Sequence, residues 1–139
     1  MNACTSLQLI VISTVDNKIV LSKYENLTKD NVVNLIINLL KKYFKKNVLF
    51  TSRNAIIDFA LINKEVNVIE LFDENIMNLV ENRKDIVNYN HHELSYNVFP
   101  LVINGDLYGS IIICDFNEIN EFELEIIRFN KMFLENYLE

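Results

Sequence analysis

The stretch FPLVINGDLYGSIIIC, from Phe99 to Cys114, predicts two adjacent antiparallel strands joined by a tight turn. The Asn104-Gly105 pair at its centre is the strongest hairpin signal in the chain, because two-residue hairpin turns require positive φ angles. The uninterrupted run from Ile111 to Ile113 favours a strand that is buried on both faces. The strand over 107–114 is therefore expected to be a central strand of a sheet.

Two further residues of this stretch, Pro100 and Gly109, predict local features of its strands. Pro100 cannot donate a hydrogen bond to a neighbouring strand, so its strand is expected to be an edge strand or to carry a bulge there. Gly109 lies inside the other strand, where a missing side chain allows a close approach. We expect that approach to be the packing of the strand against a helix.

The pattern of apolar residues outward from this hairpin predicts alternating hairpins and helices. The expected elements are a hairpin over 7–15 and 18–23, a helix over 29–45, a hairpin over 48–51 and 55–61, a helix over 74–81, the strands 95–103 and 107–114, and a helix to about residue 137. Sequential antiparallel strands with helices packed outside make an α+β fold. We predict an antiparallel sheet flanked by helices (28–139), preceded by a short β-hairpin appendage (1–27).

Composition and charge narrow the functional class. The chain has 139 residues, a net charge of −6, and only two glycines and one proline. A pI near 4.9 argues against a free-standing nucleic-acid binder. A local cluster of Lys41, Lys42, Lys45 and Lys46 fits the solvated end of a helix, where cations suit the helix dipole. No apolar run approaches the ~18 residues of a membrane span, and the start is a poor signal peptide, so we predict a cytoplasmic protein.

Catalytic and metal-binding motifs are not found in the sequence. There is no GxSxG, Walker or HExxH motif and no zinc-type cysteine spacing. Cys114 lies in an apolar run, where burial would suppress thiol reactivity. His91 and His92 are adjacent, and neighbours in an extended chain point to opposite sides, so we expect a solvated loop rather than a chelating pair. We expect no enzyme, no catalytic residues, no cofactor and no metal.

The helix expected over 29–45 has a broad apolar stripe. A stripe wider than one core face indicates burial on two sides. The second side is either a partner subunit or the core of the same chain. The first alternative predicts a homodimer or higher oligomer, with an interface formed by Val33, Ile36, Ile37, Leu40 and Phe44.

Residues 28–139 resemble the C-terminal GAF domain of the stage V sporulation protein T family of transcription regulators. The stretch 99–114, followed by an acidic helix that ends in NKMFLENYLE, carries the resemblance most specifically. NVLFTSRNAIIDFA (47–60) and ELFDENIMNLVENRKDIV (70–87) are similar to further parts of that domain. LQLIVISTVDNKIVLSKYENL (7–27) resembles the second half of the swapped-hairpin AbrB-type DNA-binding domain that precedes it.

The resemblance implies a regulatory or sensor domain that acts through dimerisation and binds a small molecule. That molecule would lie between the sheet and the segments covering it, here 62–81 and 86–93. Polar or aromatic residues expected to line such a pocket are Arg53, Tyr89, His91 and Tyr96. The identity of the ligand stays open.

Two alternatives remain. The whole family implies a DNA-binding transcription regulator, but the six residues before Leu7 hold no basic side chain and the hairpin holds only Lys18 and Lys23. Because phosphate contacts need several cations, we do not expect direct DNA binding. Alternatively, LIVISTVDNKIVLSKY also resembles the opening hairpin of longin and roadblock folds, which are protein-interaction scaffolds. Those folds pair this hairpin into the main sheet, whereas the GAF interpretation leaves it separate.

Overall fold

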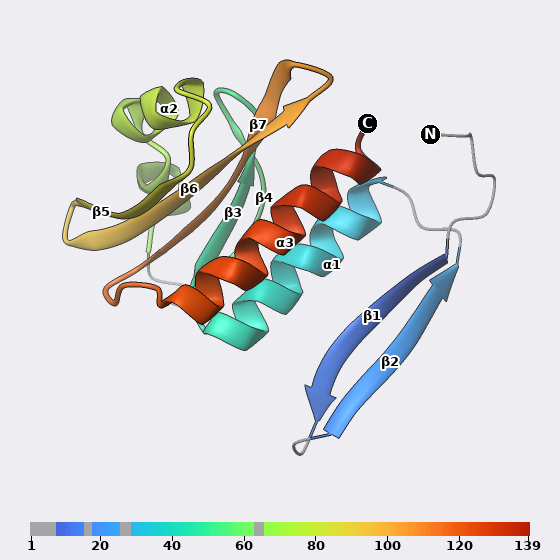
Figure 1. Cartoon of the computed structure of the whole chain (residues 1–139). Coiled ribbons are helices and arrows are strands. Elements are labelled where there is room, and N and C mark those ends of the chain that lie inside the picture. The colour runs from blue at the N-terminus through green and yellow to red at the C-terminus, as the bar shows by residue number, and fades with distance from the viewer. Residues whose placement is uncertain (1–7, 16–17, 26–28, 63–65) are drawn as a thin grey trace.

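The computed structural model describes residues 8–15, 18–25, 29–62 and 66–139 (Figure 1). Its described strands form two antiparallel sheets: a two-stranded one, β1-β2, and a five-stranded one with the order β4-β3-β7-β6-β5. The elements in chain order are β1 (Gln8–Val15), β2 (Lys18–Glu25), α1 (Lys29–Phe44), β3 (Asn47–Thr51), β4 (Ile56–Ala60), η1 (Val68–Leu71), α2 (Glu74–Glu81), β5 (Ile86–His91), β6 (Leu94–Ile103), β7 (Asp106–Asp115) and α3 (Glu121–Tyr137).

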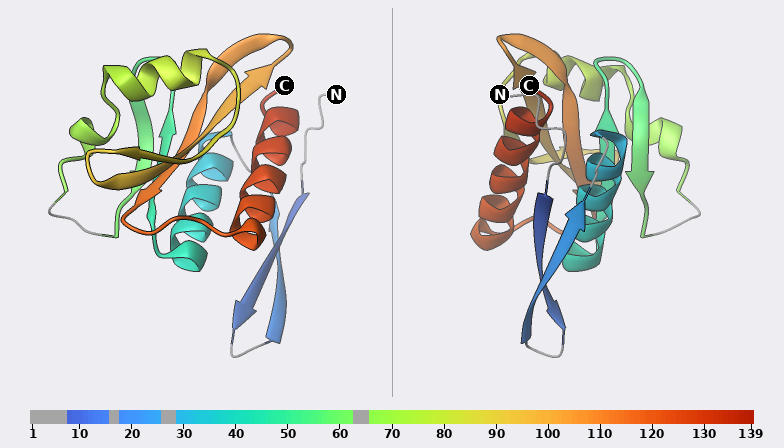
Figure 2. Two further views of the ribbon diagram at one scale, coloured as in Figure 1. Left: turned by 60° about the vertical axis from the view of Figure 1, so that its left-hand side comes forward. Right: turned by 90° about the vertical axis from the view of Figure 1, so that its right-hand side faces the viewer.

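Strand β7 is the middle strand of the large sheet, and both of its faces are buried, as the isoleucine run predicts. Ile111 and Ile113 pack into the core layer that contains α1 and α3. Ile112 and Cys114 face the opposite way, into the layer formed by η1 and α2. Figure 2 shows α1 and α3 side by side on one face of the sheet and α2 on the other. The predicted α+β architecture, an antiparallel sheet flanked by helices, is confirmed.

The broad apolar stripe of α1 lies inside the chain. Val33, Ile36, Ile37 and Leu40 are at most 6% exposed, and Phe44 packs against the same core. Their neighbours come from β3, β4 and α3 of the same chain. Of the two alternatives for this stripe, the structure has burial within one chain for Val33, Ile36, Ile37 and Leu40, whereas Phe44 is only partly buried.

Pro100 lies in β6, which is an interior strand by sheet order, and of the two expected alternatives, edge strand or bulge, a register shift follows just after it, between Leu101 and Val102. However, β5 pairs with β6 only as far as Val98, so β6 has no neighbour on that side at Pro100. Two residues further on, the N–H of Val102 donates to the Glu135 carboxylate of α3 at 2.7 Å rather than to a strand. A missing N–H at Pro100 is tolerated because that edge is locally open.

Gly109 permits a close approach, but its neighbour is a strand and not the helix expected from the sequence. A Cβ built on Gly109 would collide with the backbone carbonyl oxygen of Thr51 in β3. Beside it, the hydroxyl groups of Thr51 and Ser110 share a buried hydrogen bond of 2.6 Å. The register of β6 against β7 shifts next to Gly109, between Leu101 and Val102. This shift explains why Leu107 faces the α2 layer while Ile111 faces the α1 layer.

We expect Gly109→Ala to destabilise the chain by about 2–4 kcal/mol, because backbone atoms of two strands must separate to admit a methyl group. The matched control is Gly105→Ala in the exposed turn, where φ is +83° and a Cβ meets no atom within 4 Å. That change should cost only about 1–2 kcal/mol of backbone strain. Urea unfolding followed by circular dichroism measures both. Equal losses for the two variants would contradict the close approach.

Candidate functional site

Three of the four residues expected to line a ligand site lie together. Tyr89 and His91 belong to β5, and Tyr96 lies opposite Tyr89 on β6. The ring of His91 is 6.3 Å from that of Tyr89 and 5.9 Å from that of Tyr96, centroid to centroid. Residues 86–91, expected to be an irregular cover, form this edge strand instead. The sequence signal for a strand was weak here, because polar residues follow Ile86 and Val87.

Asp73 connects α2 to this group of aromatic rings. It is the N-cap of α2, and its Oδ1 accepts a hydrogen bond from the backbone N–H of Ile76 at 3.0 Å. Its Oδ2 faces Nε2 of His91 at 2.6 Å and Nε2 of His92 at 3.3 Å. The Asp73 carboxylate therefore caps the N-terminus of α2 with one oxygen and contacts two imidazoles with the other.

The two histidines converge, which contradicts the expectation that neighbours point to opposite sides. Their ring centroids are 4.0 Å apart. His91 ends β5, whereas His92 and Glu93 form the turn and have φ angles of +50° and +66°. Alternation applies to an extended chain, and the left-handed turn residue His92 breaks it. The convergence could not be read from the sequence, since Asp73 is 18 residues away and the turn has no Asn-Gly signal.

Two opposing effects set the pKa of Asp73. Partial burial disfavours the charged carboxylate, but the hydrogen bonds from His91 and from the Ile76 N–H favour it. The balance lowers the pKa of Asp73 below its ordinary value. Asp73 is therefore an anion at neutral pH, placed between two imidazoles.

Tyr96 attaches η1 to the face of the sheet that η1 and α2 cover. It is 1% exposed, and its hydroxyl donates to the backbone carbonyl of Leu71 in η1 at 2.9 Å. Burial, together with the nearby Cys114 and Asp73, raises the pKa of the Tyr96 phenol well above its ordinary range. Tyr96 thus stays a neutral donor that ties η1 to β6.

A cavity of about 470 Å³ opens between η1 and the β5–β6 turn. Its described lining is apolar below and polar at the rim, and consists of Val66, Asn67, Glu70, Leu71, Asp73, His92, Leu94 and Tyr96. A second hollow of about 520 Å³ lies beside α1 and β4, near Asp58. That second hollow contains none of the residues expected to bind a ligand.

Arg53, the fourth expected residue, lies elsewhere. Its guanidinium binds the carboxylate of Glu81 in two hydrogen bonds of 3.0 and 2.7 Å. Glu81 ends α2, whereas the Asp73 group lies at the start of that helix. The hydrogen bond and charge of Glu81 raise the pKa of Arg53, and the same pair lowers the pKa of Glu81. Arg53 therefore forms an exposed bridge between the β3–β4 turn and the far end of α2, and it does not line the cavity.

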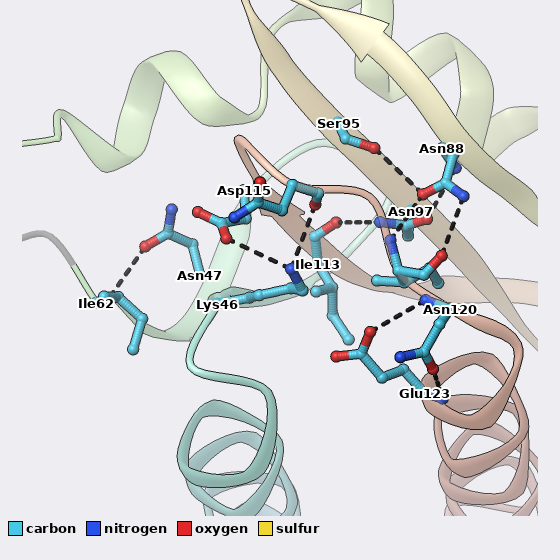
Figure 3. A network of polar contacts seen from close by, with 12 residues as sticks. Lys46, Asn47, Ile62, Asn88, Ser95, Asn97, Ile113, Asp115, Asn120 and Glu123 are labelled. Carbon is cyan, nitrogen blue, oxygen red and sulfur yellow. Dashed lines mark hydrogen bonds and ion pairs between the residues drawn. The ribbon is translucent and has the colours of Figure 1, made fainter.

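The lysine cluster does not form a uniform basic surface. Lys41 and Lys42 lie in the last turn of α1, as the dipole argument expects. Lys46 is 6% exposed and turns inward, where Nζ lies 3.4 Å from Asp115 Oδ2 and 3.3 Å from the carbonyl of Asn117 (Figure 3).

Asparagines form a polar network that sequence reasoning missed (Figure 3). The Asn88 side chain bonds both the N–H and the C=O of Ile119, at 3.0 and 3.3 Å. Its backbone N–H donates to Oδ1 of the buried Asn97 at 2.8 Å, and Ser95 donates to its Oδ1 at 3.2 Å. Asn88 has a φ of +54°, at the point where β5 shifts register. Because the chain is rich in asparagine, nothing in the sequence singled these out.

Comparison with known proteins identifies the fold. No protein-family model matches the sequence, and no curated protein matches it. Among solved structures, the cofactor-binding GAF domain of the nutrient sensor CodY from Clostridium difficile is 14% identical with a TM-score of 0.61, over 76% of this chain and 83% of that one.

Two further GAF domains match. The GAF domain/HD domain protein from Geobacter sulfurreducens is 13% identical with a TM-score of 0.62, over 81% of this chain and 93% of that one. GAF3 of Slr1393 from Synechocystis sp. PCC6803 is 9% identical with a TM-score of 0.61, over 80% and 93%. The fold is GAF-like. This agrees with the sheet order, in which β1-β2 stays outside the main sheet and so lacks the longin or roadblock pairing.

No helix within the described residues is long and apolar enough to cross a membrane. Cys114, directly opposite Tyr96 on β7, is fully buried. Burial, with a smaller contribution from Asp115, raises the pKa of the Cys114 thiol to about 12. The thiol is therefore protonated at neutral pH and is inert as a nucleophile.

A labelling experiment checks this environment. Cys4→Ser leaves Cys114 as the only thiol, because the chain has two cysteines. At pH 8 the native variant should react with Ellman's reagent at least about 100-fold more slowly than the same chain in urea, since burial and a raised pKa both suppress attack. Rapid, stoichiometric reaction of the native variant would contradict the buried placement.

Proposed function

We propose that this chain is a regulatory sensor domain that binds a small molecule in the cavity between η1 and the β5–β6 turn. The observation that carries the proposal is the cavity itself, on the α2 side of a GAF-like sheet, with Tyr96 at its base and Asp73 at its rim. The structurally similar domain of CodY is described as cofactor binding. Concave sites with an apolar floor and a few polar groups are typical of small-molecule binding.

The charge of the lining favours a neutral or cationic ligand. Glu70 and Asp73 contribute two carboxylates, and the described lining has no lysine or arginine. A phosphate or carboxylate ligand would meet repulsion there, because like charges close together in a partly desolvated site are destabilising. An amine would gain an ion pair at the rim.

The resemblance of residues 99–114 supports the narrower proposal that the chain is a regulator of the sporulation protein T type. The hairpin β1-β2, with eight residues paired on each side, is consistent with the AbrB-like appendage proposed from residues 7–27. Its strands pair with each other and not with the GAF-like sheet. DNA binding by the chain remains the alternative, and a gel shift with promoter DNA at moderate salt distinguishes the two.

We further propose that the domain dimerises, through α3 instead of the α1 stripe. Phe122, Phe129 and Met132 on α3 are each more than half exposed, and they recur at helical spacing. Phe133 and Tyr137, which are partly buried against the core, follow Phe129 at helical spacing as a stacked pair with centroids 6.0 Å apart. An apolar stripe of this kind on a helix favours a protein contact.

Ligand binding is tested by titrating the full chain with amines, nucleosides, dicarboxylates and nucleotides while recording ¹H–¹⁵N spectra. Neutral or cationic compounds should shift the amides of residues 66–73 and 92–96, and anions should not. Glu70→Gln should weaken an amine about fivefold, the loss of a partly screened ion pair, whereas the matched change Glu74→Gln outside the cavity should not. Leu94→Trp should abolish binding by filling the cavity. A titration in which no compound shifts these amides contradicts the proposal.

Dimerisation is tested by light scattering during gel filtration at several concentrations. We expect twice the 16.3 kDa chain mass at micromolar concentration. Phe129→Glu should give a monomer, because a charge is too costly to bury in an apolar interface. The control Ile57→Glu changes an equally exposed apolar residue on the outer strand β4 and should leave the dimer intact. Monomeric wild-type chain would refute this part of the proposal.

A further inference from the structure

Asp73, His91 and His92 form a group of side chains whose role goes beyond a helix cap. Their ligand atoms all lie within 4.8 Å of one another. They come from two places, the start of α2 and the β5–β6 turn, so the group exists only in the folded chain. We propose that it is a binding site for a divalent transition-metal ion of the Zn²⁺ type.

The distances are close to those of a metal site. In a tetrahedral site with metal–ligand bonds of about 2.0–2.1 Å, neighbouring ligand atoms lie ~3.3 Å apart. Nε2 of His92 already lies 3.3 Å from Asp73 Oδ2. Nε2 of His91 lies 2.6 Å from the same oxygen, as a hydrogen bond, and would move outward by ~0.7 Å when a metal replaces the shared proton.

The carboxylate is oriented for this role. Asp73 Oδ1 is held by the N–H of Ile76, so Oδ2 is the oxygen that faces the imidazoles and would bind as a single ligand. The Asp73 side chain is 32% exposed and that of His91 15%, so the site is partly shielded from water yet reachable from solvent. His92 is 70% exposed and lies on the solvent side.

A neighbouring residue can fix the orientation of His91. The Asn75 amide lies 3.3 Å from His91 Nδ1 and 3.4 Å from the hydroxyl of Tyr89. When Nε2 binds a metal, Nδ1 carries the proton, and rotation of the Asn75 amide presents its oxygen to accept it. Ligating histidines are generally held in this way by a hydrogen bond to the second ring nitrogen.

The ligand chemistry selects the class of metal. Two imidazole nitrogens and one carboxylate suit Zn²⁺, Co²⁺ or Fe²⁺, whereas Mg²⁺ and Ca²⁺ prefer oxygen ligands. Three protein ligands leave at least one coordination position for water or another molecule. Because Asp73 and His92 also line the cavity, that position lies at its rim.

The turn supports a ligand role for His92. His92 and Glu93 both adopt left-handed φ angles, where glycine or asparagine is usual. A non-glycine residue in this region is strained, and such strain gathers at functional sites. Here the strained backbone is what turns the His92 ring toward Asp73.

Metal binding is tested on the full chain, free of tags, after treatment with a chelator. Isothermal titration with Zn²⁺ alone should show one site, with a Kd of about 10 μM or tighter. Co²⁺ should give the visible absorption of a low-coordinate site. In ¹⁵N spectra of the imidazoles, Zn²⁺ should fix His91 as the tautomer protonated at Nδ1, which a merely structural ion pair would not produce.

Matched variants separate this site from other ligands in the chain. His92→Asn keeps a residue that tolerates the left-handed turn but removes the imidazole, and should lower Zn²⁺ affinity at least tenfold. Asp73→Asn retains an N-cap and should do the same. Glu93→Asn changes the adjacent turn position and should bind Zn²⁺ like the wild type, as should Cys4→Ser.

Two results would overturn the proposal. The first is that Zn²⁺ gives no saturable binding, and the second is that affinity is unchanged in His92→Asn or lost in Cys4→Ser. The probe is a metal ion alone and these variants leave Glu70 and Leu94 intact. A negative result would therefore remove the metal site without affecting the small-molecule proposal, which its own titration tests.

Discussion

The burial of both faces of β7 is the constraint on which the rest of the structure depends. Ile111 and Ile113 need one covering layer, and Ile112 and Cys114 need another. The α1–α3 pair supplies the first, and the short elements η1 and α2 supply the second. A layer built from one 3-10 turn and a two-turn helix is too small to cover the sheet evenly, so it leaves the cavity at its margin. The candidate site thus follows from how the second face is covered.

Asp73 joins that layer to the edge of the sheet. As an N-cap it satisfies a helix N–H that would otherwise lack a partner, and its other oxygen meets the two imidazoles. At the opposite end of α2, Arg53 and Glu81 form an exposed pair, which contributes little because water screens it. The helix is therefore held most firmly by its buried residues, Ile76 and Val80, and by its Asp73 end. Any ligand that binds Asp73 acts on the element that covers the sheet.

The sequence predicts those parts of the fold that depend on local patterns. The Asn104-Gly105 turn and the isoleucine run of β7 are encoded in neighbouring residues, and both predictions are confirmed. The α1 stripe shows the limit, because apolar periodicity records burial but not whether the same chain or a partner provides it. The site is less predictable still. His91 and His92 converge only through a left-handed turn and a carboxylate 18 residues away, and the Asn88 network depends on a register shift that no short motif encodes.

Strand β5 physically connects the two proposed functions. Its last residue, His91, contacts Asp73 at the cavity rim. Three residues earlier, Asn88 bonds both backbone groups of Ile119, directly before the Asn120 cap that starts α3. Side-chain amides that pair with a backbone in this way act like an added strand contact, so two hydrogen bonds join β5 to the segment that leads into α3. A ligand that drew the β5–β6 turn toward α2, as proposed, would pull through these bonds on the start of the helix that carries Phe122 and Phe129. Coupling between the ligand site and the dimer surface requires one element that both sites affect. Strand β5 meets this requirement, because it is hydrogen-bonded to Asp73 at one site and to Ile119 before α3 at the other.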